Sequence, residues 1–354
     1  MVVHERDPFN AEPPRSALLR GATTAPEDFY VRSHGPVPEL DPNTWRLRVD
    51  GLLEHELELS LDELRARFSP TEVLATLQCA GNRRAGLIAV REIPGEAPWG
   101  PGATATATWQ GVRLADVLAH AGLREDAAHV AFLGADTSPQ ADPPQPFGAS
   151  IPRRKAIGPE VLLAWGMNGQ PLPAVHGAPL RVVVPGFIGA RSVKWLERIT
   201  AQAAPSQNYF QAMSYRLLPP DSAPERADAG DGVTLGAIAL NSDILAPEED
   251  EAVPPGRLEV RGYAFAGDDR RIVRVDLSTD AGRTWQQAGF LDEQSDWAWR
   301  RWRGEVQVEP GRVEIVARAW DSSAASQPEH AASLWNPKGY VNNAWGRVSV
   351  RVGH

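Results

Sequence analysis

The chain of 354 residues has little cysteine and little lysine: one cysteine, Cys79, and three lysines, at positions 155, 194 and 338. A single cysteine excludes an internal disulfide, a multi-cysteine metal cage and, within this chain, a Cys-x-x-Cys-His haem motif. With so little lysine, an anion site here would be built mainly from arginine, which pairs with oxyanions in a bidentate way. Cys79 itself could be a buried filler, a nucleophile or a single soft metal ligand.

The chain also lacks an excess of positive charge and any long apolar run. Its net charge is −9 and its pI is near 5.5, which argues against nucleic acid or an acidic membrane surface as the main partner. No apolar stretch approaches the roughly 20 residues needed to cross a bilayer, and residues 1–14 lack the apolar segment of a secretory signal. We therefore expect a cytoplasmic protein. The alternative is an export leader removed from a longer precursor.

The first part of the chain, residues 1–218, carries both helix and strand signals. Ser60 followed by Glu63 predicts a helix that begins with a capping box. Residues 112–123 have helical spacing, and 181–185 form a short β-branched run that ends in proline, as expected of a buried strand. These patterns predict an α+β domain.

The composition and the pattern of apolar residues change after residue 218. Residues 219–232 are rich in proline and polar side chains, which is typical of a linker. In residues 233–354, alternating segments at 272–277, 313–320 and 347–352 predict short strands between turns, typical of an immunoglobulin-like β-sandwich. We therefore expect a catalytic domain at 1–218, a linker at 219–232 and a sandwich domain at 233–354.

Five segments together resemble one known family. They are the run 76–84 around Cys79 and the segments 29–38, 147–152, 167–195 and 297–302. In order and in residue type they are similar to the sulfite oxidase family of molybdenum enzymes, over about residues 29 to 350. The resemblance implies a mixed α/β molybdopterin-binding domain, an immunoglobulin-like dimerisation domain and a homodimer.

The resemblance also implies a cofactor and its contacts. The family binds molybdenum through molybdopterin, and one cysteine thiolate is the only protein ligand; Cys79 matches that ligand, and a soft anionic sulfur suits this metal. The positions that match the family's cofactor contacts are Arg32, Ser33, His34, Asp136, His176, Arg181, Gly189, Ala190, Ser192 and Lys194.

The family's substrate pocket is an arginine cluster, which Arg32, Arg84 and Arg300 match, and Trp99 is expected to line it. Binding a small anion in an acidic protein requires local positive charge, and each charge-assisted hydrogen bond contributes roughly 1.5–3 kcal/mol. Arg300 is expected to reach this pocket from the sandwich domain. Related nitrate reductases generally lack an arginine there, so Arg300 favours sulfite over nitrate.

The chain departs from the family at Phe147, where a tyrosine usually precedes Gly-Ala-Ser-Ile-Pro. Phenylalanine keeps the ring and loses the hydroxyl donor. If that hydrogen bond acts in the transition state, its loss costs roughly 1–3 kcal/mol, or about five- to 150-fold in rate. Phe147 therefore bears directly on which substrate the pocket accepts.

The resemblance implies a molybdenum-dependent enzyme that oxidises sulfite to sulfate. Electrons would pass to oxygen or to a separate carrier such as a cytochrome. One alternative is a related molybdenum oxidoreductase acting on another oxyanion, such as nitrate, or on an S-oxide. A second alternative is a non-catalytic module, with the sandwich as an interaction domain and Cys79 as filler.

Overall fold

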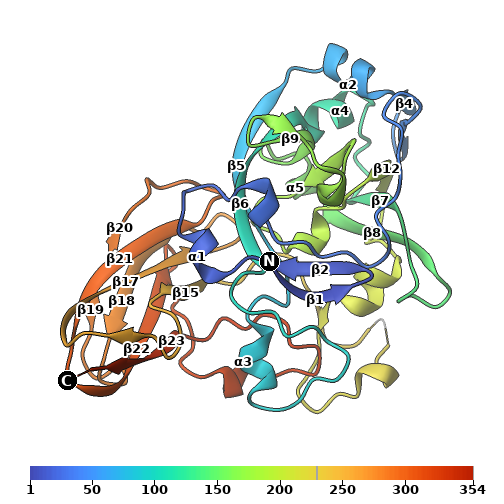
Figure 1. Ribbon diagram of the computed structural model, residues 1–354. Helices are drawn as coiled ribbons and strands as arrows, with labels where there is room; N and C mark the ends of the chain where they lie inside the picture. The colour runs from blue at the N-terminus through green and yellow to red at the C-terminus, as the bar shows by residue number, and fades with distance from the viewer. Residues whose placement is uncertain (229, 354) are drawn as a thin grey trace.

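The computed structural model describes residues 1–228 and 230–353, and Figure 1 shows two regions packed side by side. One region is a mixed α/β domain. The other, drawn in orange and red, is built from strands of the C-terminal part of the chain. The short N-terminal hairpin of β1 (Val2–Arg6) and β2 (Phe9–Glu12) lies near the junction of the two regions.

Two five-stranded sheets form the mixed domain. The first has the order β10-β9-β6-β5, with β11 beside β9, and the second has the order β4-β3-β12-β7-β8. Only the β3–β12 pair within these sheets is parallel. The strands are β3 (Leu47–Gly51), β4 (Leu57–Leu59), β5 (Thr71–Gln78), β6 (Thr104–Arg113), β7 (His129–Ser138), β8 (Gln145–Pro152), β9 (Leu162–Met167), β10 (Gln170–Pro171), β11 (Arg181–Val183) and β12 (Leu196–Gln202).

The helices around these sheets are short. They are α1 (Arg15–Leu18), α2 (Leu61–Arg67), α3 (Arg84–Ile88), α4 (Leu114–His120) and α5 (Arg153–Ala156), with 3-10 turns η1 (Pro26–Asp28), η2 (Ala174–His176) and η3 (Gly189–Arg191) and a π-helical turn η4 (Phe210–Ser214). The capping box is confirmed: the backbone N–H of Glu63 donates to the Ser60 hydroxyl, and the Glu63 carboxylate accepts from the Ser60 N–H. The helix expected over 112–123 is shorter, because Val112 still pairs with Leu163 in the sheet.

The second region is a β-sandwich, as expected. One sheet has the order β15-β17-β21-β20 and the other the order β16-β23-β22-β18-β19. The strands are β15 (Asn241–Ala246), β16 (Ala252–Val253), β17 (Gly256–Phe265), β18 (Ile272–Ser278), β19 (Gln286–Gln287), β20 (Gly289–Phe290), β21 (Arg300–Val308), β22 (Gly311–Asp321) and β23 (Gly346–Val352). The three alternating segments predict β18, β22 and β23, and apolar residues on one face of each strand, such as Val275, Ile315 and Val348, share one core with Trp302.

Between the two regions, β13 (Arg216–Leu217) pairs with β14 (Val233–Thr234), and the intervening segment contains η5 (Pro224–Arg226). A last 3-10 turn, η6 (Ala331–Leu334), contacts α3 of the mixed domain. The boundaries at 218 and 233 remain a prediction.

Buried polar contacts join the two regions beside Cys79. The Arg83 guanidinium forms an ion pair with Asp243, with 3.1 Å between Nε and Oδ2, and donates to the Ala344 carbonyl at 2.7 Å. The backbone N–H of Thr76 in β5 donates to the Trp297 carbonyl at 2.8 Å, and the Thr76 hydroxyl accepts from the Trp299 N–H at 2.7 Å. The sandwich therefore packs directly on the strand that leads to Cys79.

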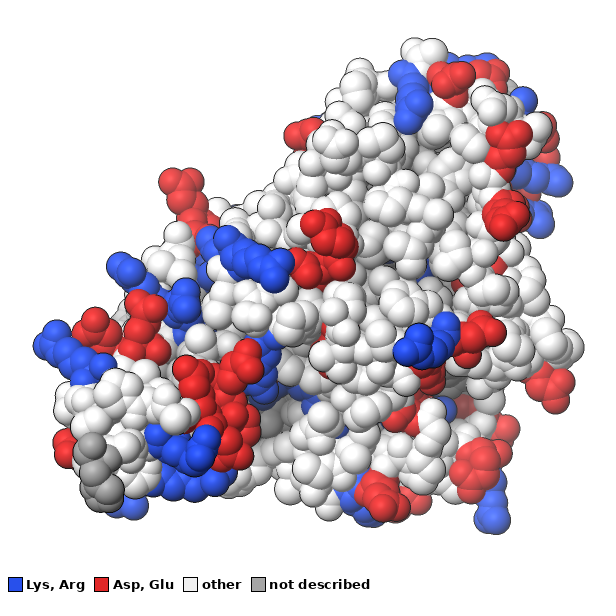
Figure 2. All heavy atoms as spheres, in the orientation of Figure 1, with Lys and Arg blue, Asp and Glu red and all other residues white. Residues whose placement is uncertain are grey.

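The surface mixes both signs of charge. On the face drawn in Figure 2, basic and acidic side chains are interspersed, and broad areas carry neither. Within residues 1–228 and 230–353, no helix combines the length and the apolar character that a membrane span requires.

Candidate active site

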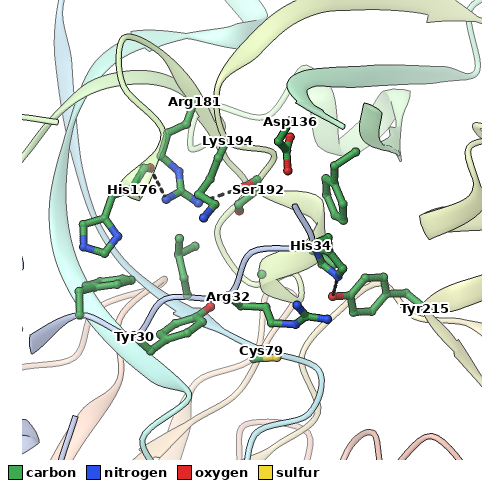
Figure 3. Close-up of a pocket in the computed structure, with 15 residues that line it drawn as sticks. Tyr30, Arg32, His34, Cys79, Asp136, His176, Arg181, Ser192, Lys194 and Tyr215 are labelled. Carbon is green, nitrogen blue, oxygen red and sulfur yellow. Dashed lines mark hydrogen bonds between the residues drawn. The ribbon is translucent and has the colours of Figure 1, made fainter. Parts of the chain in front are cut away.

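A cavity lies in the mixed domain and contains Cys79 in its wall. Of the residues predicted to contact a cofactor, it is lined by Arg32, His34, Cys79, Asp136, His176, Arg181, Gly189, Ala190, Ser192 and Lys194. Ser33 is not in the lining, but its hydroxyl accepts a hydrogen bond from Lys194 at 2.8 Å. Side chains far apart in the sequence thus converge on one space (Figure 3).

Cys79 follows the last residue of β5 and turns into the loop before α3. Its N–H donates to the Ala103 carbonyl at 2.9 Å, and its sulfur accepts from the Gly81 N–H at 3.4 Å. The residue is buried, and burial raises the pKa of its thiol, while the charges of Arg84 and Arg32 oppose that rise. A metal at the sulfur would add the charge that stabilises the thiolate.

One wall of the cavity is a set of cationic and donor groups. The Arg181 guanidinium donates to the carbonyls of His176 and Ser192, both at 2.9 Å. Lys194 donates to the Val175 carbonyl at 3.1 Å, and burial together with the charge of Arg181 lowers its pKa. Burial also lowers the pKa of His176 to about 4, so this ring is neutral at neutral pH. This wall suits a ligand that carries a phosphate and hydrogen-bond acceptors.

Asp136, on β7, adds an acceptor to that wall. Among the described residues, its buried Oδ1 atom has no hydrogen-bond partner, and burial raises the pKa of the carboxyl group. Buried polar atoms without a partner are rare in folded proteins, so this oxygen is well placed to accept from an N–H of a bound group. The donor wall and this acceptor together fit the phosphate and the hydrogen-bonding edge of a pterin.

Arg32 and His34 enter the cavity from the loop after η1. The loop is anchored by the Ser33 N–H, which donates to the Asn10 side-chain oxygen at 2.8 Å. Within the part of the chain that the structure describes, the Arg32 side chain donates through Nη1 to the Ser33 carbonyl and, weakly, to Asn10. Its remaining N–H groups can therefore face a ligand in the cavity.

Arg84 and Trp99 are not among the residues that line the cavity. The Arg84 guanidinium donates to the carbonyls of Ala97 at 3.0 Å and Lys338 at 3.1 Å, and it lies 3.1 Å from the Glu96 carboxylate. Trp99 is fully buried in the apolar cluster that also contains Cys79. The structure therefore places both residues next to the Cys79 loop without placing either in the cavity wall.

The expected position of Arg300 is corrected by the structure. Its guanidinium lies 3.6 Å from the centre of the Phe290 ring and donates to the Asp292 carbonyl at 3.2 Å, within the sandwich. The reason is the alternation of side chains along an extended strand. Trp299 packs toward the mixed domain, where its indole N–H donates to the Ala22 carbonyl at 2.9 Å, so its neighbour Arg300 faces away.

The sandwich reaches the site through another loop, residues 335–342. The Lys338 ammonium lies 3.7 Å from Glu96, the carboxylate that also pairs with Arg84. The Tyr340 ring lies 5.3 Å below the Arg84 guanidinium and stacks on Tyr215 at 5.5 Å. The sequence pattern did not single out this loop.

Two tyrosines in the cavity wall were also missed, Tyr30 and Tyr215, while Phe147 lines the cavity as expected. Tyr30 stands two residues before Arg32, inside a recognised segment, so its position was a usable signal. Tyr215 follows η4, close to the predicted linker, and no local pattern marks it as a site residue.

Comparison with known proteins agrees with this geometry. The family model for an oxidoreductase molybdopterin binding domain matches residues 34–210, and the model for a Mo-co oxidoreductase dimerisation domain matches residues 234–353. The fold and the cavity thus define a molybdopterin-binding oxidoreductase with a dimerisation domain.

Individual relatives identify the family to which the chain belongs within this class. The chain is 44% identical to sulfite oxidase of Gallus gallus over 98% of its length and 76% of the relative's. It is 38% identical to the nitrate reductase of Hordeum vulgare over 98% of its length, but it spans only 41% of that protein. It also spans 65% and 66% of the rat and human sulfite oxidases. The crystal structure of the sulfane dehydrogenase SoxCD from Paracoccus pantotrophus superimposes with a TM-score of 0.82 at 27% identity, over 95% of this chain and 83% of that one. The chain belongs to the sulfite oxidase family of molybdenum oxidoreductases.

Proposed function

We propose that this protein oxidises sulfite to sulfate at a molybdenum centre held by molybdopterin and Cys79. Sulfite and water give sulfate, two protons and two electrons, and the electrons leave to a separate acceptor. The observation that supports the proposal is one cavity that unites the buried Cys79 thiol, the Arg32 guanidinium and a wall of cationic and N–H donor groups. When bound, the cofactor supplies the oxygen-atom transfer and takes up the two electrons.

The cavity residues divide into cofactor and substrate groups. Lys194, Arg181 and His176 would hold the phosphate end and the acceptor edges of the pterin. Asp136 would accept from a pterin N–H. These groups need little rearrangement, because protein carbonyls already orient the donors. Gly189, Ala190 and Ser192 line the same cavity and would place their backbone against the cofactor.

We assign the main contact with sulfite to Arg32, because it lines the cavity and keeps N–H donors for an anion. Arg84 acts on the same region through its charge, which opposes the rise in the pKa of Cys79. Phe147 contributes an apolar ring to the cavity. Trp99 belongs to the same buried apolar cluster as Cys79 and would support its loop by packing. Charged groups held in place before the anion arrives lower the cost of binding it.

The remaining proposals concern assembly, electron transfer and location. The chain carries a dimerisation domain, and we propose that it forms a homodimer, which analytical ultracentrifugation would test. We further propose an external electron acceptor, either oxygen or a cytochrome, and a cytoplasmic location. Stopped-flow reoxidation with each acceptor and cell fractionation would test these points.

Sulfite-dependent reduction of ferricyanide by molybdenum-loaded protein tests the main proposal. The protein should come from a host that makes molybdopterin, and its molybdenum content should be measured first. We expect reduction that depends on sulfite and on bound molybdenum. Loaded protein that reduces no ferricyanide with sulfite would refute the sulfite assignment. Protein that takes up no molybdenum in that host would refute the enzyme assignment altogether.

A second candidate substrate is nitrate. Two observations favour it: the relative from Hordeum vulgare is a nitrate reductase, and Arg300, expected to disfavour nitrate, lies away from the cavity. Reduction of nitrate by the dithionite-reduced protein, in parallel with the ferricyanide assay, separates the two substrates.

A further inference from the structure

The N-terminal hairpin of β1 and β2, dark blue in Figure 1, ends in a buried segment. Strand β1 exposes Val2 and Val3, whereas Asn10, Ala11 and Glu12 of β2 are at most 5% exposed. Burying an amide and a carboxylate in a terminal strand is costly unless both are hydrogen-bonded. The partners of these side chains therefore indicate what the hairpin does.

The Glu12 carboxylate binds the loop 99–103. Its Oε1 atom accepts from the Gly100 N–H at 2.7 Å, and its Oε2 atom accepts from the Gly102 N–H at 2.8 Å. Nε2 of His4 lies 2.9 Å from Oε1. The close approach requires glycine at position 102, because a Cβ atom there would lie 2.8 Å from Oε2. The carboxylate thus holds the loop at two backbone positions by charge-assisted hydrogen bonds.

The same loop is bonded to the segment that carries Cys79. Three backbone hydrogen bonds of 2.8 to 3.0 Å join them, from the N–H groups of Cys79, Arg83 and Ala85 to the carbonyls of Ala103, Gly100 and Trp99. Arg83 has a φ of 65°, which is uncommon for a residue with a side chain, so this backbone depends on outside contacts. Gly100 is bonded to Glu12 through its N–H and to Arg83 through its carbonyl. A change at Glu12 therefore reaches the Cys79 segment through one residue.

The other end of β2 binds the loop that carries Arg32. Oδ1 of Asn10 accepts from the Ser33 N–H at 2.8 Å and lies 3.4 Å from Nη1 of Arg32. The Asn10 amide nitrogen donates back into the hairpin, which orients this oxygen. Ala11 and Val31 exchange both backbone hydrogen bonds, at 3.0 and 2.8 Å. One short strand thus holds both the Arg32 loop and the loop bonded to the Cys79 segment.

We propose that the N-terminal hairpin is a brace that fixes the separation of Arg32 from Cys79, with Glu12 and Asn10 as positioning residues. Neither of these two side chains lines the cavity, so they act through the two loops. The inference rests on the proposed function, and it extends the site to a hairpin that lies outside both matched family models. The spacing matters because misplacing a reacting group by about 1 Å can cost about a hundredfold in rate.

Glu12→Gln in molybdenum-loaded protein tests the Cys79 side of the brace. A side-chain amide cannot accept from both glycine N–H groups, because one of its two polar atoms is itself a donor. We expect amide hydrogen exchange at Cys79 and Arg83 to quicken about ten- to 150-fold, the value of one charge-assisted hydrogen bond. The kcat for sulfite should fall about ten- to hundredfold at unchanged sulfate affinity. Unchanged exchange at both N–H groups would overturn the role of Glu12.

Asn10→Ala tests the Arg32 side of the brace. Alanine removes the acceptor of the Ser33 N–H, so the Arg32 loop loses its polar anchor. We expect sulfate binding to loaded protein, measured by calorimetry, to weaken about two- to tenfold, the value of one neutral hydrogen bond. Exchange at the Cys79 N–H should stay the same. Unchanged sulfate affinity would overturn the role of Asn10.

Asp280→Asn is the matched control. Asp280 also accepts from two backbone N–H groups, those of Arg283 at 3.0 Å and Thr284 at 2.9 Å, but in a turn of the sandwich and away from the cavity lining. This variant should lower the urea midpoint without changing exchange at Cys79, sulfate affinity or kcat. The same changes in Asp280→Asn as in Glu12→Gln would mean that both report a general loss of stability, and they would overturn the positioning role.

These outcomes are distinct from those that test the proposed function. Loaded, unsubstituted protein without sulfite oxidation would refute the proposed function. Amide exchange needs neither turnover nor a bound anion, so exchange in Glu12→Gln would still decide whether the hairpin holds the Cys79 segment. If Glu12→Gln does not fold, the sulfate affinity of Asn10→Ala decides whether the hairpin positions the site.

Discussion

Replacing Arg84 by methionine should loosen the contact between the Cys79 loop and the sandwich domain. The side chain is nearly fully buried, with 4% of its area exposed. Its guanidinium donates to the carbonyls of Lys338, Gly339 and Ala97 at 3.0 to 3.3 Å and pairs with Glu96 at 3.1 Å. Methionine keeps the unbranched apolar stem of the side chain but removes the guanidinium, which leaves these acceptors without a donor.

The size of the effect follows from those contacts. Removing one partner of a buried charge pair costs roughly 3–5 kcal/mol, because the groups left behind stay desolvated. That is a large share of the roughly 5–15 kcal/mol by which a typical domain is stable. Arg84→Lys keeps the charge and part of the hydrogen bonding, so it should cost less than Arg84→Met.

Amide hydrogen exchange locates the effect better than global unfolding, because this chain has two domains. The reporter is the N–H of Val341, which donates to the Ala80 carbonyl at 2.9 Å across the same contact. We expect its exchange in Arg84→Met to quicken by roughly a hundredfold or more, as the free-energy loss above implies. The urea midpoint should also fall.

Arg91→Met is the matched control. Arg91 lies 3.1 Å over the Trp335 ring and donates to the Pro220 carbonyl at 2.8 Å, but at an exposed site. Its loss should cost about 1 kcal/mol or less, since exposed charges are well screened. Exchange at Val341 that is equal in Arg84→Met and in the unsubstituted protein would refute the reasoning.

Further predictions concern the cavity. Cys79→Ser should fold normally but lose its molybdenum and its turnover, which metal analysis and the ferricyanide assay would show. Arg32→Met should weaken sulfate binding, measured by calorimetry, about ten- to 150-fold, the value of one charge-assisted hydrogen bond. Phe147→Tyr should raise kcat/KM for sulfite about five- to 150-fold. For His176, burial lowers the pKa from 6.5 to about 4. The unfolded state therefore binds the proton first, and unfolding free energy measured in urea should fall by up to about 3 kcal/mol as pH drops from 6.5 to 4.

Each of these predictions has an outcome that would contradict it. Full molybdenum content in Cys79→Ser would remove the ligand role, and unchanged sulfate affinity in Arg32→Met would remove its anion role. A slower Phe147→Tyr enzyme would show that the apolar ring is preferred at that position. For the pH effect, His176→Gln is the control variant, and an acid decline as steep as in the unsubstituted protein would contradict the assignment to His176.

Local sequence patterns were enough for much of the fold. The capping box at Ser60, the strand expected over 181–185 and observed at 181–183, and the alternating strands of the sandwich depend on neighbours in the chain, so their signals survive in a single sequence. The helix expected over 112–123 was too long, because sheet pairing of Val112 overrides its helical spacing.

By itself, the sequence determined the family, the two-domain order and most of the cavity lining, since most residues that line the cavity lie in short, distinctive segments. Which other side chains lie next to those segments is decided by the tertiary structure alone. Arg300 directly follows Trp299, but its side chain contacts the sandwich whereas that of Trp299 contacts the mixed domain. Tyr215 and Tyr340 meet across the domain contact although 125 positions separate them. Such contacts depend on how two domains pack, and no pattern among neighbours in the chain records that packing.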